Sequence, residues 1–224
     1  MKKIVVITGA GISAESGIST FRDSDGLWEK YKITDVATPD GWYRNPQLVL
    51  DFYNQRRKEL MNCQPNAAHI GLAELESNFD VQIITQNIDN LHERAGSSNV
   101  LHLHGELTKA CDLGKQKIVD IGYNDIKLGD KIGNSQMRPF IVWFEEAVPE
   151  IDKAIELVKI ADIALVIGTS LKVYPAAGLL SYINSNAPIY LIDPNEVETY
   201  NKNIHFLQMK ATEGVKEFRK LVGM

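Results

Sequence analysis

A glycine-rich turn near the start of the chain constrains the fold more than any other stretch. Gly9, Gly11 and Ala14 directly follow Lys3–Thr8, a β-branched apolar run that indicates a buried parallel strand. Glycines after a strand let the backbone approach a diphosphate closely, and a following helix presents free N–H groups to that anion. The stretch therefore predicts a dinucleotide-type site. A glycine turn without a ligand is the less favoured alternative.

Two common nucleotide folds do not fit this turn. A P-loop is excluded because no Gly-Lys-Ser/Thr sequence follows the glycines. A standard dehydrogenase is disfavoured because that fold places an acidic ribose ligand about 20 residues further on, at the end of a second strand. Here residues 20–26 form a polar stretch with no strand pattern.

The length and composition of the chain are ordinary for a soluble globular protein. Its 224 residues are 44% hydrophobic and 24% charged, enough for one domain with a smaller lobe. A net charge of -5 without a basic block disfavours a nucleic-acid partner. No stretch is long and apolar enough to span a membrane, so no membrane partner is expected. Two distant cysteines predict no disulfide framework, which favours the cytoplasm. The apolar start is interpreted as the first strand rather than a signal peptide.

Apolar runs alternate with amphipathic segments along most of the chain. This alternation is typical of an α/β, Rossmann-like, doubly wound parallel sheet. Strands are expected at 3–8, 81–85, 100–106, 139–144, 164–170 and 189–193, and helices at 48–60, 65–75, 151–160 and 213–222.

Two weakly patterned or helical stretches interrupt this alternation. We expect one catalytic domain over 1–224, with a small lobe built from inserts at about 29–65 and 106–138. The large lobe then comprises about 1–28, 66–105 and 139–224. Residues 107–138 are expected to be an excursion outside the main core.

Polar residues follow the expected strand at 81–85. Gln86, Asn87 and Asp89 lie where ligands bind in open α/β sheets, at the carboxyl ends of strands. Alternation in residues 100–106 predicts that His102 and His104 share one face of a short strand. Asn90 and His92 fit solvent-facing helix positions equally well and are left out of the site.

With these residues in place, the sequence resembles the sirtuins, the NAD-dependent protein-lysine deacylases. The resemblance runs from Ile7 to the C-terminal helix. It is carried by the motifs GAGISAESGISTFR, TQNIDNLHERAG, LHLHGE, PFIVWFEE, VIGTS and YLIDPNE. The stretches TPDGWYRNPQLVLDFYNQRRKEL and QPNAAH are most similar to the bacterial and mitochondrial branch that removes succinyl and malonyl groups.

The resemblance implies a reaction and three catalytic residues. The carbonyl oxygen of an acyl-lysine in a protein or peptide attacks C1′ of the nicotinamide ribose, nicotinamide leaves, and the acyl group ends on ADP-ribose. His104 matches the general base, and Asn87 and Asp89 match the residues around the nicotinamide pocket. An imidazole with a pKa near 6.5 suits proton transfer at neutral pH. His102 is expected to be a satisfied core residue.

The resemblance also implies the set of residues that contact NAD. Asp193 stands where the family commonly has Asn, and Phe21 matches a ring that covers the reactive ribose. The full set is Gly9, Ala10, Gly11, Ile12, Glu15, Phe21, Arg22, Gln86, Asn87, Asp89, Gly168, Thr169, Ser170, Asp193 and Ala211.

Two further groups match the substrate side. Val142, Trp143 and Phe144 resemble a strand that pairs with the substrate peptide, although Glu145 replaces the usual glycine. Tyr53 and Arg56 match a Y-x-x-R pair that would bind the carboxylate of a succinyl or malonyl group. Spacing alone favours a core tyrosine and a surface arginine, and the family pattern in matching flanks favours the functional interpretation instead.

Most sirtuins hold a structural zinc with four cysteines, and this chain is expected to hold none. Residues 106–139 contain one cysteine, Cys111, and no histidine, and the second cysteine, Cys63, lies in the other insert. Packing is expected to replace the metal, through Ile118, Ile121, Tyr123, Ile126 and Leu128. The alternatives to a deacylase are an NAD hydrolase or ADP-ribosyltransferase on the same scaffold and, less favoured, an inactive NAD-binding sensor.

Overall fold

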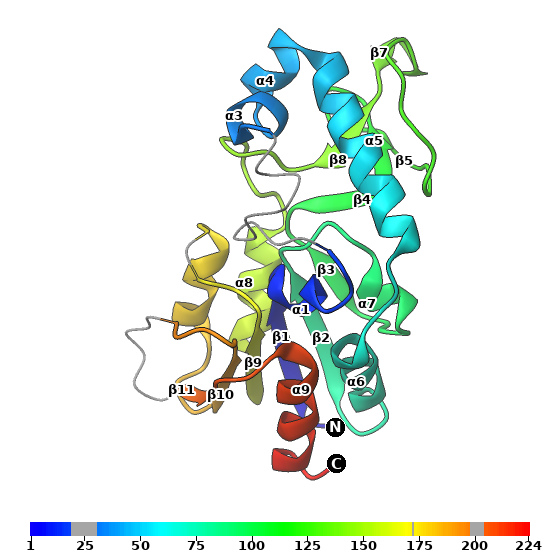
Figure 1. Ribbon diagram of the computed structural model, residues 1–224. Helices are drawn as coiled ribbons and strands as arrows, with labels where there is room; N and C mark the ends of the chain where they lie inside the picture. Colours follow the sequence, from blue (N-terminus) through cyan, green and yellow to red (C-terminus); the bar gives the residue numbers. More distant parts are fainter. Residues whose placement is uncertain (19–30, 172, 198–203) are drawn as a thin grey trace.

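A parallel sheet forms the larger part of the molecule in the computed structural model, which describes residues 1–18, 31–171, 173–197 and 204–224 (Figure 1). Within these residues, six strands lie in the order β11-β10-β9-β1-β2-β3 and all pair in parallel. They are β1 Lys3–Thr8, β2 Asp80–Thr85, β3 Val100–His102, β9 Ile163–Ile167, β10 Ile189–Ile192 and β11 Ile204–Leu207. This order confirms the predicted Rossmann-like architecture.

The central strand β1 lies between β2 and β9, where the strand order reverses. At the carboxyl end of β1, Thr8 pairs with Thr85 on one side and with Ile167 on the other. Open α/β sheets bind ligands in the crevice outside such a reversal. The fold therefore places the segments after β1, β2 and β9 around one candidate site.

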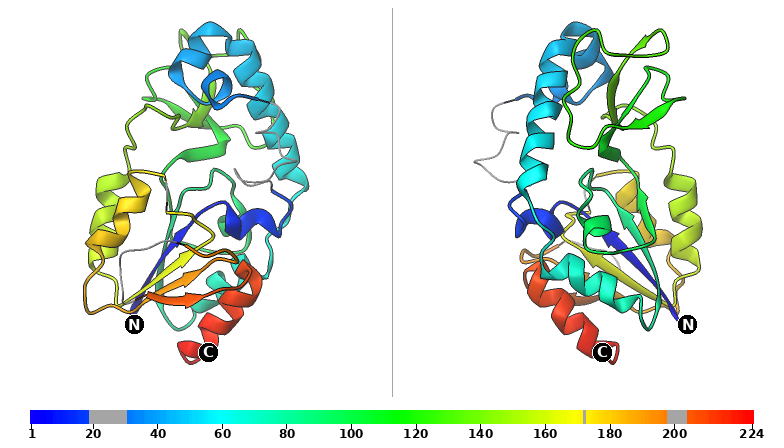
Figure 2. Two further views of the ribbon diagram at one scale, coloured as in Figure 1. Left: turned by 60° about the vertical axis from the view of Figure 1, so that its left-hand side comes forward. Right: turned by 90° about the vertical axis from the view of Figure 1, so that its right-hand side faces the viewer.

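Helices cover both faces of this sheet, which explains the apolar runs in its strands (Figures 1 and 2). Val5 and Ile7 pack in one cluster with α8, Ile151–Lys159, and the 3-10 helix η1, Ala176–Tyr182. Ile4 and Val6 pack in another cluster with α6, Ala67–Leu75, and α9, Ala211–Leu221.

A second, antiparallel sheet lies at the carboxyl-end side of the large sheet (Figure 1). It has the order β5-β4-β8, next to a β6–β7 hairpin and the helix α5. These elements are β4 Gly105–Cys111, β5 Ile118–Asp120, β6 Lys131–Ile132, β7 Ser135–Gln136, β8 Arg138–Ile141, α3 Ile33–Val36, α4 Pro39–Arg44 and α5 Pro46–Asn62. The short helices α1, Gly11–Ala14, and α7, Leu91–Arg94, belong to the large sheet's loops.

The long helix α5 begins where the sequence provides a cap. Asn45 accepts a hydrogen bond from the Leu48 amide through its side chain, and Pro46 occupies the first helical position. Its buried face includes Phe52, Tyr53 and Leu60. No helix in the described ranges is long and apolar enough to cross a membrane.

Two expectations about the strands are wrong, and two elements were not expected. Residues 100–106 do not form one strand, because the chain turns at Gly105 (φ 80°) and leaves the large sheet for β4. A Cβ at Gly105 would lie 2.1 Å from the Phe140 carbonyl oxygen, so the turn requires glycine. Residues 139–144 do not return to the large sheet, because β8 pairs with β4 and ends at Ile141. The strand β11 and the helix η1 lie in stretches for which no element was expected.

The expected packing of the second insert is partly wrong. Ile126 is buried, and Ile121 and Tyr123 pack against the same cluster as α5. Ile118 and Leu128 are instead exposed. Residues 107–138 also contribute core positions on β4, since Leu107, Ala110 and Cys111 are buried.

Candidate active site

Two glycine turns from different strands touch at the centre of the site. The Gly11 amide donates to the Gly168 carbonyl at 2.9 Å, and the Gly9 amide donates to the Ile167 carbonyl at 3.0 Å. A Cβ on Gly11 would lie 2.6 Å from Gly168 Cα, and one on Gly9 would lie 2.8 Å from Gly168 O. Because neither turn has room for a side chain, backbone alone lines this part of the crevice.

Asn87 and Asp89 meet in a buried polar network after β2. The Asn87 amide group donates to Gly9 O at 3.1 Å and to Ser13 Oγ at 3.2 Å. Ser13 Oγ in turn donates to Asp89 Oδ2 at 3.0 Å, and Asp89 Oδ1 accepts from the Leu91 amide at 3.1 Å. Burial raises the pKa of Asp89, against these two hydrogen bonds. The network fixes both predicted side chains beside the glycine turn.

Two buried histidines extend this network, and neither was predicted to belong to it. His69 Nδ1 accepts from the Asn66 amide at 3.3 Å, which leaves Nε2–H to donate to Ser13 Oγ at 3.4 Å. His92 Nε2 lies 3.1 Å from Thr8 Oγ1. Burial lowers the pKa of His69 to about 4 and that of His92 well below its usual value, so both are neutral at pH 7. No local pattern identified His92, because Asp89 precedes α7 whereas His92 lies within it.

His104 has the environment of a general base. Its Nδ1–H donates to the Gln86 carbonyl at 2.9 Å, so the lone pair of the neutral ring is on Nε2. Burial lowers the pKa of His104, against that hydrogen bond, and keeps the ring neutral at physiological pH. A half-buried, neutral imidazole with one acceptor nitrogen can take a proton from a substrate hydroxyl.

His102, two residues away, has both nitrogens engaged. Nδ1 lies 3.0 Å from the Asn87 carbonyl and Nε2 lies 2.8 Å from Glu93 Oε1. Burial opposes its charge, but the hydrogen bond to Glu93 and the charge of that carboxylate raise the pKa of His102. His102 is therefore a satisfied structural residue, as expected.

Polar side chains also connect the segments after β2 and β9. The Gln86 amide donates to Thr169 Oγ1 at 3.2 Å, beside the partly buried Ser170. Asp193, after β10, is buried, and its Oδ1 accepts from the Asn195 amide at 2.9 Å. One Asp193 oxygen is therefore used within its own turn.

Three other predicted cofactor contacts have structural partners. Both Glu15 carboxylate oxygens accept from Thr212, one from its amide at 3.0 Å and one from its hydroxyl at 2.9 Å. This contact joins α1 to the start of α9, where Ala211 is buried. Ile12 is fully buried in the core beneath the turn. Phe21 and Arg22 lie outside the described residues.

Tyr53 and Arg56 lie together on α5. The guanidinium of Arg56 is 5.8 Å from the Phe52 ring centroid and interacts electrostatically with Tyr53 and Asp89. Burial raises the pKa of Tyr53 to about 12, although Arg56 lowers it, so the phenol keeps its proton. The neighbouring Arg57 is fully buried, whereas Arg56 is half-buried. The pattern of charges along α5 did not show which of the two arginines is buried.

Val142, Trp143 and Phe144 follow β8 rather than form a strand. Their amides donate to the His104 carbonyl at 2.9 Å, to Glu146 Oε2 at 2.7 Å and to the Ala37 carbonyl at 3.0 Å. Trp143 is buried, whereas Phe144 is exposed. Glu145 has a φ of 72°, so it keeps the left-handed backbone that a glycine would favour.

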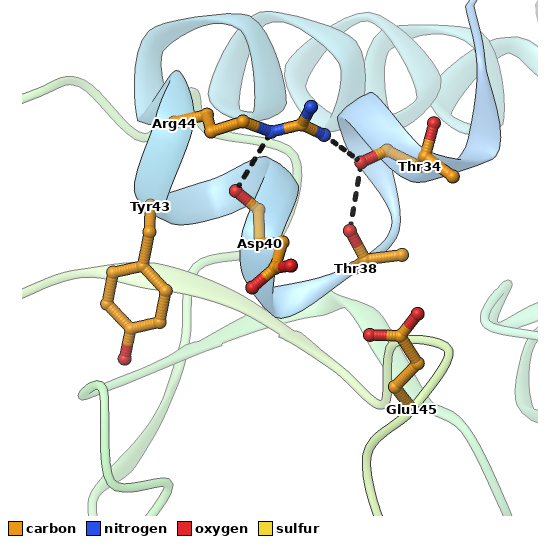
Figure 3. A pocket seen from close by; sticks show the side chains of 6 residues that line it. All are labelled: Thr34, Thr38, Asp40, Tyr43, Arg44 and Glu145. Atoms are coloured by element: carbon orange, nitrogen blue, oxygen red, sulfur yellow. Dashed lines mark hydrogen bonds between the residues drawn. The ribbon is translucent and has the colours of Figure 1, made fainter.

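A separate pocket of about 400 Å³ opens between α3, α4 and Glu145 (Figure 3). Arg44 donates to the Thr34 carbonyl there at 2.8 Å, and Thr38 Oγ1 donates to the same oxygen at 2.9 Å. None of the residues with predicted catalytic or cofactor roles lines this pocket. The pocket is therefore separate from the polar cluster at the carboxyl ends of the strands.

Comparison with known proteins matches this chain to one family along most of its length. The model of the Sir2 family matches residues 9–175. A protein of Bacteroides thetaiotaomicron named NAD-dependent protein deacylase is 56% identical, over 99% of this chain and 98% of its own length. A protein of Helicobacter pylori with the same name is 56% identical, over 100% of this chain and 99% of its own.

Solved structures give the same result for the fold. A Sir2 homologue in complex with NAD has a TM-score of 0.87 at 39% identity, covering 99% of this chain and 91% of its own. A Sir2 protein with a deacetylated p53 peptide and 3′-O-acetyl ADP-ribose has a TM-score of 0.81 at 32% identity, covering 99% and 94%.

Proposed function

The chain belongs to the Sir2 family and is an NAD-dependent protein deacylase, and we propose that it removes acidic acyl groups, succinyl and malonyl, as well as acetyl from protein lysines. The neighbouring positions of the buried Tyr53 and the half-buried Arg56 on α5 carry this proposal. A guanidinium binds a carboxylate through two parallel hydrogen bonds, and a protonated phenol can add a third. An acetyl group has no carboxylate to offer them.

The residues around the crevice fit NAD. The Gly9, Gly11 and Gly168 backbones pack too closely to admit side chains, and such a glycine turn after a strand suits a diphosphate. Gln86 and Thr169 offer polar groups beside it. Bound NAD supplies a ribose carbon that becomes electrophilic as nicotinamide leaves.

The chain's own residues then have distinct roles. Asn87 and Asp89, held by Ser13, orient the nicotinamide amide and favour positive charge on the ribose. His104 accepts a hydroxyl proton at Nε2, because its Nδ1–H is committed to the Gln86 carbonyl. Val142 and Phe144 keep their proposed contact with the acyl-lysine peptide, whereas the side chain of Trp143 is buried away from it.

We also propose that the protein needs no zinc and acts in the cytoplasm. Cys111 is the single cysteine of residues 106–139, and one cysteine cannot supply the four ligands of a structural zinc site. The described residues contain no group of three or more histidine, cysteine or acidic side chains placed to hold a metal.

A direct assay tests the proposed activity. The protein is incubated with NAD alone and with NAD plus one peptide carrying acetyl-, succinyl- or malonyl-lysine, and both nicotinamide and deacylated peptide are measured. We expect turnover only with peptide and a higher kcat/KM for the acidic acyl groups. NAD consumption that ignores the peptide would instead indicate the hydrolase alternative, which the deacylase relatives do not favour.

A matched pair of variants on α5 tests the acyl preference. Losing a charged hydrogen bond costs roughly 1.5–3 kcal/mol, so Arg56→Met should lower kcat/KM for succinyl-lysine by roughly 10- to 100-fold and spare acetyl-lysine. Lys58→Met removes an exposed charge from the same helix and should change neither. Equal losses on both substrates after Arg56→Met would refute the acidic-acyl proposal.

A further inference from the structure

The Tyr53 hydroxyl has a buried hydrogen-bond partner, Trp143, from the segment that follows β8. Trp143 Nε1–H donates to Tyr53 Oη at 3.1 Å, across 90 residues of sequence. Both side chains are almost fully buried, with 3% and 2% of their surfaces exposed. Trp143 is therefore too enclosed for the peptide contact expected from its sequence position.

Charged groups fix the Trp143 indole in place. The Arg138 guanidinium lies 3.3 Å from the Trp143 ring centroid, and the Trp42 ring packs against it at 5.7 Å. Glu146 accepts from the Trp143 amide at 2.7 Å, from Arg138 at 3.0 Å and from Lys115 at 2.7 Å. An indole held at its backbone and its face cannot turn its N–H away from Tyr53 without breaking these contacts.

The fixed indole limits what the Tyr53 hydroxyl can do. Since Trp143 occupies one acceptor position of the oxygen, the phenolic proton is the group left to offer. Arg56 lies one turn further along α5, and its positive charge acts electrostatically on the Tyr53 side chain. We infer that Trp143 is a positioning residue for acyl selectivity, whose indole N–H orients the Tyr53 hydroxyl so that its proton points to the acyl carboxylate.

This inference rests on the proposed acidic-acyl activity and adds a residue that touches no substrate. A double-mutant cycle tests it with Trp143→Phe, Tyr53→Phe and the double variant, each measured on succinyl- and acetyl-lysine peptides. Trp143→Phe should raise KM for succinyl-lysine, lower its kcat/KM by roughly 3- to 10-fold, and leave acetyl-lysine unchanged. In the Tyr53→Phe background the same change should have no further selective effect.

Controls separate positioning from packing. Trp42→Phe makes the same volume change next to Trp143 and should lower stability without altering the succinyl-to-acetyl ratio. If Trp143→Phe does not fold, replacing its indole by benzothiophene keeps the ring shape and removes only the N–H. Equal losses on both acyl groups, or additive losses in the double variant, would overturn the inference. A wild-type protein inactive on succinyl-lysine would instead refute the proposed function itself.

Discussion

The neighbouring arginines of α5 should respond differently to substitution by methionine: Arg57→Met should lower stability, and Arg56→Met should change acyl selectivity. Arg57 is fully buried, and its Nε and Nη1 donate to the Leu107 carbonyl and to Asn54 Oδ1, each at 2.8 Å. These bonds tie α5 to β4. Burial lowers the pKa of Arg57 to about 10, against the nearby Asp125, so the side chain is still charged at neutral pH. Arg57→Met removes both bonds while keeping most of the apolar stem.

The size of the loss follows from three terms. Two charge-assisted hydrogen bonds are worth roughly 1.5–3 kcal/mol each. The loss is offset because Arg57 Nη2 is buried with no hydrogen-bond partner among the described residues, and methionine removes that unsatisfied group. A net destabilisation of about 3 kcal/mol corresponds to a fall in Tm of roughly 6–12 °C for a chain of this size.

Thermal unfolding followed by circular dichroism, together with kcat/KM on both acyl peptides, checks this pair. Arg57→Met should lower Tm and, well below its unfolding transition, keep the succinyl-to-acetyl ratio of the wild type. Arg56→Met should change the ratio and leave Tm within about 2 °C of the wild type and of Lys58→Met. A Tm for Arg57→Met that stays within that margin would refute the buried-anchor reasoning, as would an equal fall for Arg56→Met.

Three further predictions concern the crevice and the small lobe. His104→Ala should lower kcat roughly 100- to 10,000-fold with little change in Tm. Only the neutral imidazole can act as a base, and burial lowers the pKa of His104, so wild-type kcat/KM should be flat near neutral pH and fall only below about pH 6.5. A fall in kcat/KM that begins above pH 7 would contradict the assignment of His104 as the base. Gly11→Ala should abolish measurable NAD binding by calorimetry, while Gly114→Ala, whose Cβ would meet nothing closer than 3.6 Å, should bind NAD normally. Elemental analysis should find no zinc, and a chelator should leave Tm unchanged; about one zinc per chain would contradict the proposal.

The sequence predicted the central strands of the large sheet well because they are buried on both faces, whereas the partly exposed edge strand β11 was not expected. Runs such as Ile4–Ile7 are continuously apolar, a pattern that few other elements produce. The small sheet has no such pattern. Its strand β5 spans three residues, and Ile118 at its start is exposed, so nothing in the local sequence separates it from a loop. Its pairing depends on long-range contacts that periodicity does not encode.

The candidate site was predicted where local motifs determine the backbone. The spacing of Gly9 and Gly11 indicated the turn, but not that Gly168 would lie against it from another strand. His92 matched a surface helix position, and only tertiary packing places it against Thr8. Likewise, Arg56 and Arg57 are chemically identical in sequence and differ only in which one faces β4.

The bond between Glu15 and Thr212 has a consequence for biosynthesis. The two residues are 197 positions apart, so at roughly 5–20 residues per second Thr212 is synthesised about 10–40 s after Glu15. Strand β1 likewise has no β9 to pair with until most of the chain exists. The nucleotide crevice therefore forms only near the end of translation. Until then the apolar strand Ile4–Ile7 keeps an open hydrogen-bonding edge on its β9 side, and such an edge favours pairing with other chains.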